Sequence, residues 1–379
     1  MKKVLITATV QSHVCQFHKP LIDLLHEHGY EVHVAARDNL SQKNGLKLDY
    51  VEKVINIPFS RSPLSFSNIK AYKLLKQLIS RENYEIIHCN TPMGGVLTRF
   101  ACKRARIKGA LVIYTAHGFH FYKGASIKNW VFYYPIEKYL SKKTDAIITI
   151  TNEDYILAKD KFKCRVFHTF GVGVRTAKFD SYSSEGSTQF RKDNGWSNNK
   201  IILCIGELNK NKNQIALVKS MPNILRLHEN AILLLAGNGP YKDKIEQLIS
   251  ELNLKSKVIM LGYRTDLEKY VRSADVVVSL SKREGLPVNI LEAMYCKKPV
   301  VASNNRGHRE LIENNANGIL LNIINPETVS IAIDSIFNNG NLVIEFVTKS
   351  YDKVQSYLDV EVKKQLASIY FDSLVRNDR

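Results

Sequence analysis

The chain has 379 residues, of which 54 are Lys or Arg and 36 are Asp or Glu, so its formal net charge is +18 at pH 7. The length predicts two domains that can each bury a core. No apolar stretch approaches the roughly 18 residues of a spanning helix, and the start MKKVLITATVQSH is typical of a first strand, not of a signal peptide. The six cysteines form no CxxC pair or zinc-like cluster, so we expect reduced thiols in a cytoplasmic protein.

Most of the positive charge lies in the first half of the chain. Residues 1–180 contain 28 Lys or Arg against 14 Asp or Glu, a net +14, whereas the remainder contains 26 against 22, a net +4. This asymmetry predicts an anionic partner for the first half: nucleic acid, an anionic membrane surface or a phosphorylated substrate. The alternative is a soluble protein with a lysine-rich surface and no such partner.

Short β-branched runs alternate with amphipathic segments from the N-terminus onward. Strands are expected at Val4–Ala8, Glu31–Ala35, Ile86–Cys89, Leu111–Ala116 and Ala146–Thr151. A polar loop is expected after the first strand, and helices near Pro20–His28, Asn68–Ser80, Gly94–Ala105 and Trp130–Leu140. This alternation predicts an α/β domain with a parallel, doubly wound sheet.

The same pattern restarts after residue 200. Strands are expected at Ile201–Ile205, Ala231–Ala236, Val258–Leu261, Val276–Leu280 and Val300–Ala302. Residues 181–199 are polar and turn-rich, and the preceding GVGV at 171–174 is interpreted as the crossover between domains. We therefore predict domains over 1–175 and 176–350, with a helical segment over 351–379 that packs back on the first domain.

Two segments carry candidate functional residues. Glu284 lies in a turn after an apolar strand, and Glu292 lies on the helix that we expect to follow Pro287. The free amides and positive end of such a helix suit a diphosphate. In the first domain, His117 follows an apolar strand and precedes a glycine, which predicts a position at the carboxyl edge of the sheet.

In this order and spacing, the segments resemble glycosyltransferase family 4, whose members have the GT-B fold of two facing Rossmann-like domains with a cleft between them. The resemblance covers nearly the whole chain. It rests on GELNKNKN at 206–213, LAGNGP at 235–240, VIMLG at 258–262, ADVVVSLS at 274–281, the E-x7-E element from Glu284 to Glu292, and PVVAS at 299–303. It implies a retaining glycosyltransferase that moves a sugar from a nucleotide-diphosphate donor, expected to be UDP-linked, to a saccharide acceptor.

The resemblance also implies individual roles in donor binding. Glu284 would bind hydroxyls of the donor sugar and Glu292 the ribose. The diphosphate would lie near the backbone of Gly285, Leu286 and Pro287, and the strand ending at Gly262 would pass beside the nucleobase.

One cationic position of the family pattern is altered. Lys212 matches the lysine that neutralises the diphosphate, but Glu207 stands where an arginine is expected. Lys210 or Arg264 could supply the missing positive charge. A solvated surface loop is the alternative interpretation of residues 206–213.

Three histidines of the first domain are assigned by the resemblance and by position. His117 matches the active-site histidine that contacts the donor sugar. His13, in the loop expected after the first strand, and His120 are expected to face the acceptor side of the cleft.

The mechanism is predicted partly from missing residues. No first-domain carboxylate stands out at a strand end as the general base of an inverting enzyme. In retaining relatives the leaving diphosphate itself is thought to accept the proton, so catalysis would depend on positioning and on neutralising the diphosphate charge by Lys212, Lys210 and the helix N-terminus at residues 285–288. His117, Lys212 and Glu284 are the residues predicted to be catalytic. No aspartate-x-aspartate metal motif is evident, and we expect no metal and no other cofactor.

Two basic stretches suggest where the acceptor binds. Arg99, Lys103, Arg104, Arg106 and Lys108 crowd one expected helix end. Residues 119–143 contain eight aromatic residues and five lysines, which suit an anionic membrane interface if they are exposed, although aromatic residues buried in the core are the alternative.

We therefore predict a lipid-linked or oligosaccharide acceptor and peripheral association of the first domain with the inner face of the plasma membrane, in cell-surface polysaccharide biosynthesis. No nucleic-acid partner is expected, because no recognition motif accompanies the charge. A non-catalytic, polyanion-binding protein of GT-B shape and a GT-B sugar-nucleotide epimerase remain alternatives.

Overall fold

The computed structural model describes residues 2–42 and 46–374. They form two compact units. Unit 1 contains the described residues up to Gly173 together with those from Asp359 onward, and unit 2 is Val174–Leu358. The domain limits predicted from sequence were residues 175 and 350.

Unit 1 contains a seven-stranded parallel sheet in the order β3-β2-β1-β4-β5-β6-β7. The strands are β1 (Lys2–Val10), β2 (Tyr30–Arg37), β3 (Lys53–Asn56), β4 (Ile86–Asn90), β5 (Leu111–Ala116), β6 (Ala146–Thr149) and β7 (Arg165–His168). The five expected strands are present, and the two strands that sequence reasoning missed, β3 and β7, are the edges of the sheet.

The helices of unit 1 differ from expectation at one place that matters for the site. They are α1 (Gln11–Phe17), α2 (Lys19–Glu27), α3 (Ser67–Glu82), α4 (Pro92–Ala101), α5 (Lys103–Ile107), α6 (Ile127–Ser141) and α7 (Asn152–Lys161), with a 3-10 turn at Leu40–Gln42. The prediction of a loop after the first strand is wrong, because α1 begins directly after β1. Its polar residues Gln11 and Ser12 are buried, so the segment lacks an apolar helical stripe.

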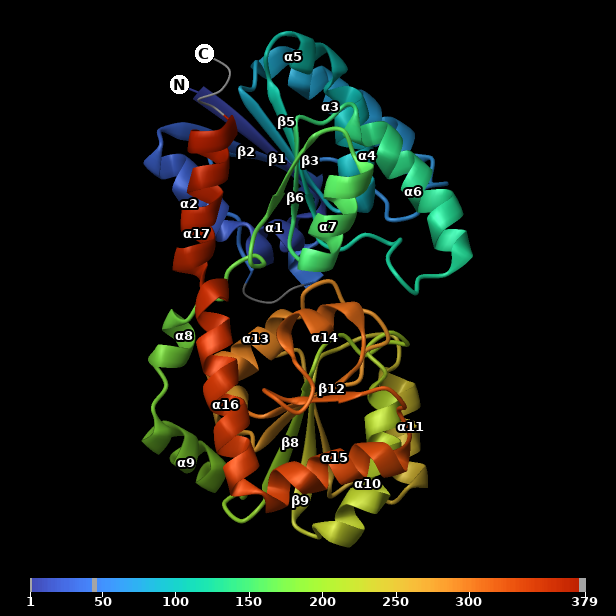
Figure 1. Cartoon of the computed structure of the whole chain (residues 1–379), viewed down its shortest axis with the longest axis vertical. Coiled ribbons are helices and arrows are strands. Elements are labelled where there is room, and N and C mark those ends of the chain that lie inside the picture. The colour runs from blue at the N-terminus through green and yellow to red at the C-terminus, as the bar shows by residue number, and fades with distance from the viewer. Residues whose placement is uncertain (1, 43–45, 375–379) are drawn as a thin grey trace. The chain divides into compact units, whose positions relative to one another are not determined.

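The C-terminal segment completes the core of unit 1. Helix α17 (Asp359–Ala367) lies beside α2, as Figure 1 shows, and a π-helical turn, Ser368–Leu374, follows it. Five buried residues of this segment join the core beside β1 and β2: Val362, Leu366, Ile369, Tyr370 and Leu374. The prediction that the C-terminal helix packs back on the first domain is confirmed.

Unit 2 contains a six-stranded parallel sheet in the order β10-β9-β8-β11-β12-β13. The strands are β8 (Lys200–Ile205), β9 (Ala231–Ala236), β10 (Val258–Gly262), β11 (Val276–Ser279), β12 (Val300–Ser303) and β13 (Ile319–Leu321). Only the short edge strand β13 was not expected. Two apolar cores cover the two faces of this sheet.

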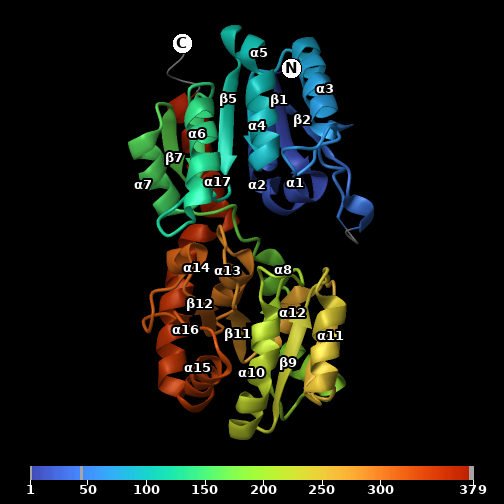
Figure 2. The ribbon, with the colours of Figure 1, turned by 90° about the vertical axis from the view of Figure 1, so that its right-hand side faces the viewer.

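The helices of unit 2 are α8 (Ala177–Asp180), α9 (Ser184–Asp193), α10 (Gln214–Leu227), α11 (Lys242–Glu251), α12 (Leu267–Ser273), α13 (Val288–Tyr295), α14 (Arg306–Leu311), α15 (Pro326–Asn338) and α16 (Gly340–Val354), followed by a 3-10 turn at Gln355–Tyr357. Helices α10 and α11 lie side by side next to β9 (Figure 2). The polar segment 181–199 contains α9, whose N-cap Ser183 accepts a hydrogen bond from Gly186 N. It therefore holds a helix where only a turn-rich connection was expected.

Each sheet has one point at which the strand order reverses. It lies between β1 and β4 in unit 1 and between β8 and β11 in unit 2. Loops that leave the carboxyl ends of the two strands at such a point diverge to opposite faces, and ligands of doubly wound folds bind there. These two positions contain most of the candidate residues.

Candidate active site

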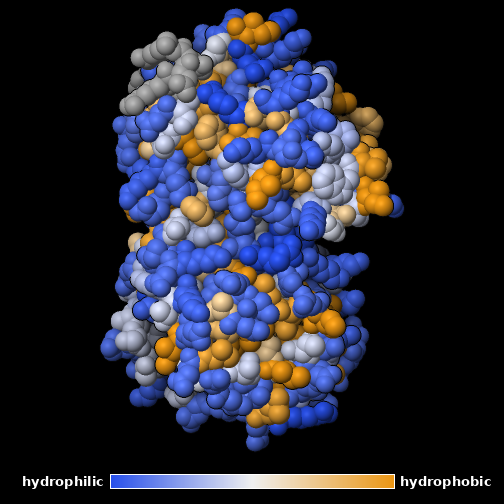
Figure 3. Space-filling model, in the orientation of Figure 1, coloured by the Kyte–Doolittle hydropathy of each residue, from blue (hydrophilic) through white to orange (hydrophobic). Residues whose placement is uncertain are grey.

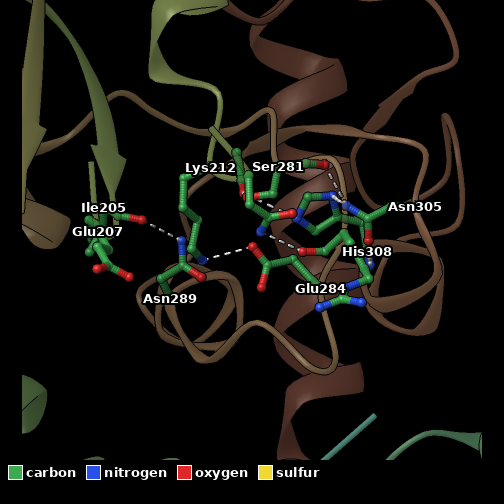
Figure 4. Close-up of polar contacts among 12 residues, drawn as sticks. Ile205, Glu207, Lys212, Ser281, Glu284, Asn289, Asn305 and His308 are labelled. Carbon is green, nitrogen blue, oxygen red and sulfur yellow. Dashed lines mark hydrogen bonds and ion pairs between the residues drawn. The ribbon is translucent and has the colours of Figure 1, made fainter. Parts of the chain in front are cut away.

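The loops that follow β8 and β11 meet at the switch point of unit 2. Lys212 lies between β8 and α10, and Glu284 lies between β11 and α13. Lys212 Nζ is 2.7 Å from Glu284 Oε1, and Figure 4 shows the two side chains pointing toward each other. The side chains are only 23% and 13% exposed. The structure thus brings together two predicted site residues that lie 72 positions apart.

Backbone contacts hold these two loops in place. Lys282 N donates to Asn211 O at 2.8 Å, and Asn211 Nδ2 donates to Arg283 O at 2.9 Å. Gly206 has a φ of +153°, and a Cβ there would lie 3.1 Å from Lys212 Cε. Glycine therefore leaves room for the lysine stem against the end of β8.

Three glycines bring neighbouring loops of this edge into backbone contact. Gly237 N, after β9, donates to the carbonyl of Gly262 at the end of β10. A Cβ on Gly237 would lie 2.0 Å from Gly206 O, so only glycine permits this approach. The predicted nucleobase segment ending at Gly262 is therefore joined to the loop that carries Lys212.

The turn at residues 285–287 leads into α13 as expected. Pro287 is the N-cap, with φ −81° and ψ 104°, and the helix begins at Val288. The turn is packed against α14, because a Cβ on Gly307 would lie 2.3 Å from Gly285 O and 2.7 Å from Glu284 Cβ. The positive end of this helix therefore lies beside Glu284, where it would suit an anion.

Glu292 lies further along α13 and has a different partner. Its Oε1 is 2.7 Å from Lys178 Nζ of α8, and its side chain is 12% exposed. Because Glu284 and Glu292 each pair with a separate lysine, the two carboxylates form two sites and do not share a proton as an acid–base couple would.

Arg264, Lys210 and Glu207, the three residues connected with the altered cationic position, differ in their contacts. Arg264 forms a two-pronged ion pair with Asp266, at 2.8 and 2.7 Å, which raises the pKa of Arg264 and neutralises its charge locally. Lys210 is exposed in the same loop as Lys212. Glu207 is exposed and accepts a hydrogen bond from Asn209 Nδ2 at 3.1 Å. Of the two proposed substitutes, Lys210 is the one with an available charge.

His308 is a buried residue of this site that sequence reasoning missed. Its Nδ1 donates to Ser303 O at 2.7 Å and its Nε2 accepts from Ser279 Oγ at 3.1 Å, so it connects the ends of β11 and β12. Asn305 Nδ2 donates to Ser281 O at 2.8 Å in the same group. Burial lowers the pKa of His308 to about 4, and the ring is neutral at pH 7. No feature of the segment SNNRGHRE distinguishes this histidine in the sequence.

The switch point of unit 1 holds His117 and His13. His117 follows β5, and its Nε2 lies 3.2 Å from Asn90 Oδ1 and 3.2 Å from His13 Nε2. Burial lowers the pKa of His117 to about 4, so a neutral imidazole is available as a hydrogen-bonding group at pH 7. His13 projects from α1, not from a loop as predicted.

Two further histidines lie behind this pair and were not predicted. The ring of His18 is 5.5 Å from that of His117 and 5.9 Å from that of His88. His88 is bound on both sides, by Thr115 Oγ1 at 2.7 Å and by the hydroxyl of Tyr370 at 2.6 Å. The C-terminal segment thus contributes to the support of the histidine cluster.

A pocket of about 1270 Å³ opens in unit 1 beside this cluster. His13 and His120 both line it, and the ring of His120 stacks on Tyr133 of α6 at 4.5 Å. Its lining includes the exposed apolar residues Leu64, Phe66, Ile69, Phe100, Phe132 and Ile136. The pocket therefore offers a large apolar surface next to the histidines.

The structure resolves the alternatives for the basic and aromatic stretches residue by residue. Phe119 and Phe121 are buried in the core, whereas Phe132 is 67% exposed. Arg99 was expected on the basic surface and this is wrong: its side chain is buried and forms a two-pronged ion pair with Glu137 at 2.8 and 3.0 Å.

The exposed apolar residues of unit 1 are concentrated over α6. In Figure 3 apolar residues gather at the side where Figure 1 draws this helix. Ile127, Val131 and Phe132 are 82%, 60% and 67% exposed, with Lys128 and Lys138 exposed among them. In the part of the chain that the structure describes, no helix has the length and apolar character to cross a bilayer.

Two parallel doubly wound sheets, each with its candidate residues at the switch point, define the protein class. The fold is GT-B, and the protein is a glycosyltransferase. Two family models match it: "Glycosyl transferase 4-like" over residues 3–152 and "Glycosyl transferases group 1" over residues 186–353. The chain belongs to glycosyltransferase family 4.

Individual relatives are similar to this chain over most of its length. EpsD of Bacillus subtilis is 37% identical over 97% of this chain and 96% of its own. An Escherichia coli UDP-Gal:alpha-D-GlcNAc-diphosphoundecaprenol alpha-1,3-galactosyltransferase is 26% identical over 86% of this chain and 89% of its own. Among solved structures, Anabaena HepE in complex with UDP and glucose has a TM-score of 0.77 at 19% identity, covering 97% of this chain and 99% of that one.

Proposed function

We propose that the protein transfers a sugar, with retention of configuration, from a UDP-linked donor to a lipid-linked saccharide in bacterial cell-surface polysaccharide biosynthesis. Unit 2 would bind the donor and unit 1 the acceptor. The observation that carries the proposal is the Lys212–Glu284 pair at the switch point of unit 2, beside the N-terminus of α13.

The donor assignment is supported by the chemistry of this pair and its neighbours. A lysine and a helix N-terminus together neutralise a diphosphate, and a carboxylate bound to that lysine is placed to accept hydrogen bonds from sugar hydroxyls. Glu292, on the same helix with its own lysine, would hold the ribose diol. The HepE complexes, which contain UDP and UDP-glucose, favour uridine.

The acceptor assignment is supported by the pocket of unit 1. A soluble oligosaccharide does not require a large exposed apolar lining, whereas the chain of a lipid-linked acceptor does. Exposed lysines around Ile127 and Phe132 suit the anionic surface of a membrane. The E. coli relative and a Campylobacter jejuni relative, 27% identical over 44% of this chain, are both named for diphospho-undecaprenol-linked acceptors.

The proposed step breaks the bond between the sugar C1 and the β-phosphate oxygen and forms a bond from C1 to the acceptor oxygen on the same face. The acceptor hydroxyl proton passes to the leaving diphosphate. Lys212 and the start of α13 would neutralise the charge that develops there, and the neutral His117 would contact the transferred sugar. No metal is assigned a role in this step.

Matched variants of the two glutamates test the donor assignment. Purified protein is heated with UDP, GDP and a panel of UDP-sugars, and a ligand at about 100 times its Kd should stabilise the fold by about 2.7 kcal/mol. Glu292→Gln should weaken binding of UDP and UDP-sugar alike. Glu284→Gln should weaken only the extra affinity that the sugar provides, and should not weaken UDP binding. A wild-type protein that responds to no nucleotide would overturn the proposal.

Membrane association and stereochemistry need separate measurements. Sedimentation with anionic vesicles should pull down the wild-type protein, and Phe132→Ser with Val131→Ser should reduce the bound fraction without changing UDP binding.

The anomeric configuration of the product, read by NMR, should equal that of the donor. Inverted product would refute the retaining step.

A further inference from the structure

Three histidine side chains of unit 1 converge on one point. His13 comes from α1, His18 from the junction of α1 and α2, and His117 from the end of β5. One ring nitrogen from each lies within 4.8 Å of the other two. His13 Nε2 and His117 Nε2 are 3.2 Å apart. These groups come from two separate backbone segments, His13 and His18 from α1 and its C-cap and His117 from the end of β5, so the fold has fixed their convergence.

The spacing is that of metal ligands. Zinc binds imidazole nitrogen at about 2.0–2.1 Å in tetrahedral geometry, which separates two ligand nitrogens by roughly 3.3 Å. The observed 3.2 Å between His13 and His117 matches this separation. The His18 nitrogen lies within 4.8 Å of the other two, and its ring would have to turn toward them to reach ligand distance.

The third ring has a nitrogen that the protein leaves unsatisfied. His18 is 4% exposed, and among residues 2–42 and 46–374 its Nε2 has no hydrogen-bond partner. Buried polar atoms normally have a partner, and an exception suggests an ion or water at that position.

We propose that His13, His18 and His117 form a site for a single Zn²⁺ ion, and that its occupation inhibits the enzyme. Three imidazoles with one remaining position suit zinc more than Mg²⁺ or Ca²⁺, which prefer oxygen ligands. Inhibition rests on the proposed function, because a His117 held by zinc would no longer be free to contact the transferred sugar. The ion is thus an inhibitor and not a cofactor.

Metal binding is measured apart from sugar transfer. Chelator-treated protein is titrated with Zn²⁺ by calorimetry and with Co²⁺ by absorption, which reports the geometry of the site. We expect one ion per chain with a tetrahedral Co²⁺ spectrum. His18→Gln and His13→Gln should each weaken binding by about tenfold or more. The matched control His26→Gln removes a partly exposed histidine of α2 and should leave the affinity unchanged. Circular dichroism shows whether each variant is folded.

The outcomes separate the two proposals. Failure of folded wild-type protein to bind Zn²⁺ saturably, or equal affinity in all four proteins, would overturn the site. If zinc binds at this site but does not slow sugar transfer by the wild type, the inhibitory role is wrong. If instead the proposed function is wrong, chelator-treated protein will show no thermal stabilisation by UDP-sugars.

Discussion

Replacing Lys212 tests the central contact of the donor site. In Lys212→Met the apolar stem that packs against Gly206 is retained and only the charge is lost. A hydrogen bond to a charged group contributes about 1.5–3 kcal/mol, and about 1.4 kcal/mol changes an equilibrium constant tenfold. The Kd for UDP should therefore rise about 10- to 150-fold. Glu284, 13% exposed and left without its cation, acts in the same direction by repelling the diphosphate.

The assay is calorimetric titration with UDP, with Lys210→Met as the matched control. Lys210 is exposed in the same loop, and because solvent screens its charge, its loss should weaken UDP binding by only a few fold. The double variant Lys212→Met/Glu284→Gln should regain part of the binding, because the unpaired carboxylate is removed. UDP binding within twofold of wild type in Lys212→Met, or an equal loss in Lys210→Met, would refute the reasoning.

Three further changes probe the structure around the site. Gly307→Ala should lower the unfolding free energy of unit 2 by about 1–3 kcal/mol in urea denaturation and abolish donor binding, because the new methyl overlaps the turn that carries Glu284. The control Gly340→Ala should do neither, because a Cβ there meets nothing within 4 Å. Arg99→Met should cost about 3–5 kcal/mol of unfolding free energy by leaving Glu137 buried and unpaired, and a loss below about 1 kcal/mol would contradict this ion-pair assignment. Because burial holds the pKa of His308 at about 4, below its value in the unfolded chain, the neutral ring stabilises the fold above about pH 6.5, and this contribution is lost as the pH falls through 4. His308→Gln should flatten the decline of unfolding free energy between these pH values, and an unchanged slope would show that another group is responsible.

The sequence predicted the central strands because they are buried on both faces. Runs such as Leu111–Ala116 and Ala231–Ala236 are almost entirely apolar and are buried at every position, and their predicted bounds agree with the structure. The edge strands β3 and β7 were not predicted, because one side of each lacks a neighbouring strand and their residues are alternately exposed or only half-buried. Helix α9 was not predicted for a related reason: none of its residues is buried, so its sequence shows no apolar stripe.

The candidate site was predicted in its parts but not in its pairings. Sequence reasoning placed Lys212 and Glu284 near one ligand through the resemblance, yet the direct contact depends on loops 72 residues apart. His18 could not be distinguished from a core histidine, because its proximity to His117 arises only when β1 and β5 take their places on either side of β4. Arg99 was misplaced because its charge gives no sign of Glu137, 38 residues away.

The joining of the C-terminal segment to the core of unit 1 has a consequence during synthesis. The first unit lacks part of its packing until residues 359–374 emerge, well after residue 173. Translation at roughly 5–20 residues per second places about 10–40 s between these two moments. Throughout that interval the nascent first half exposes the apolar surface beside β1 and β2 that this segment later covers. Unit 2, encoded by one uninterrupted stretch, can finish folding first, so unit 1 is the part whose folding must wait for the last residues of the chain.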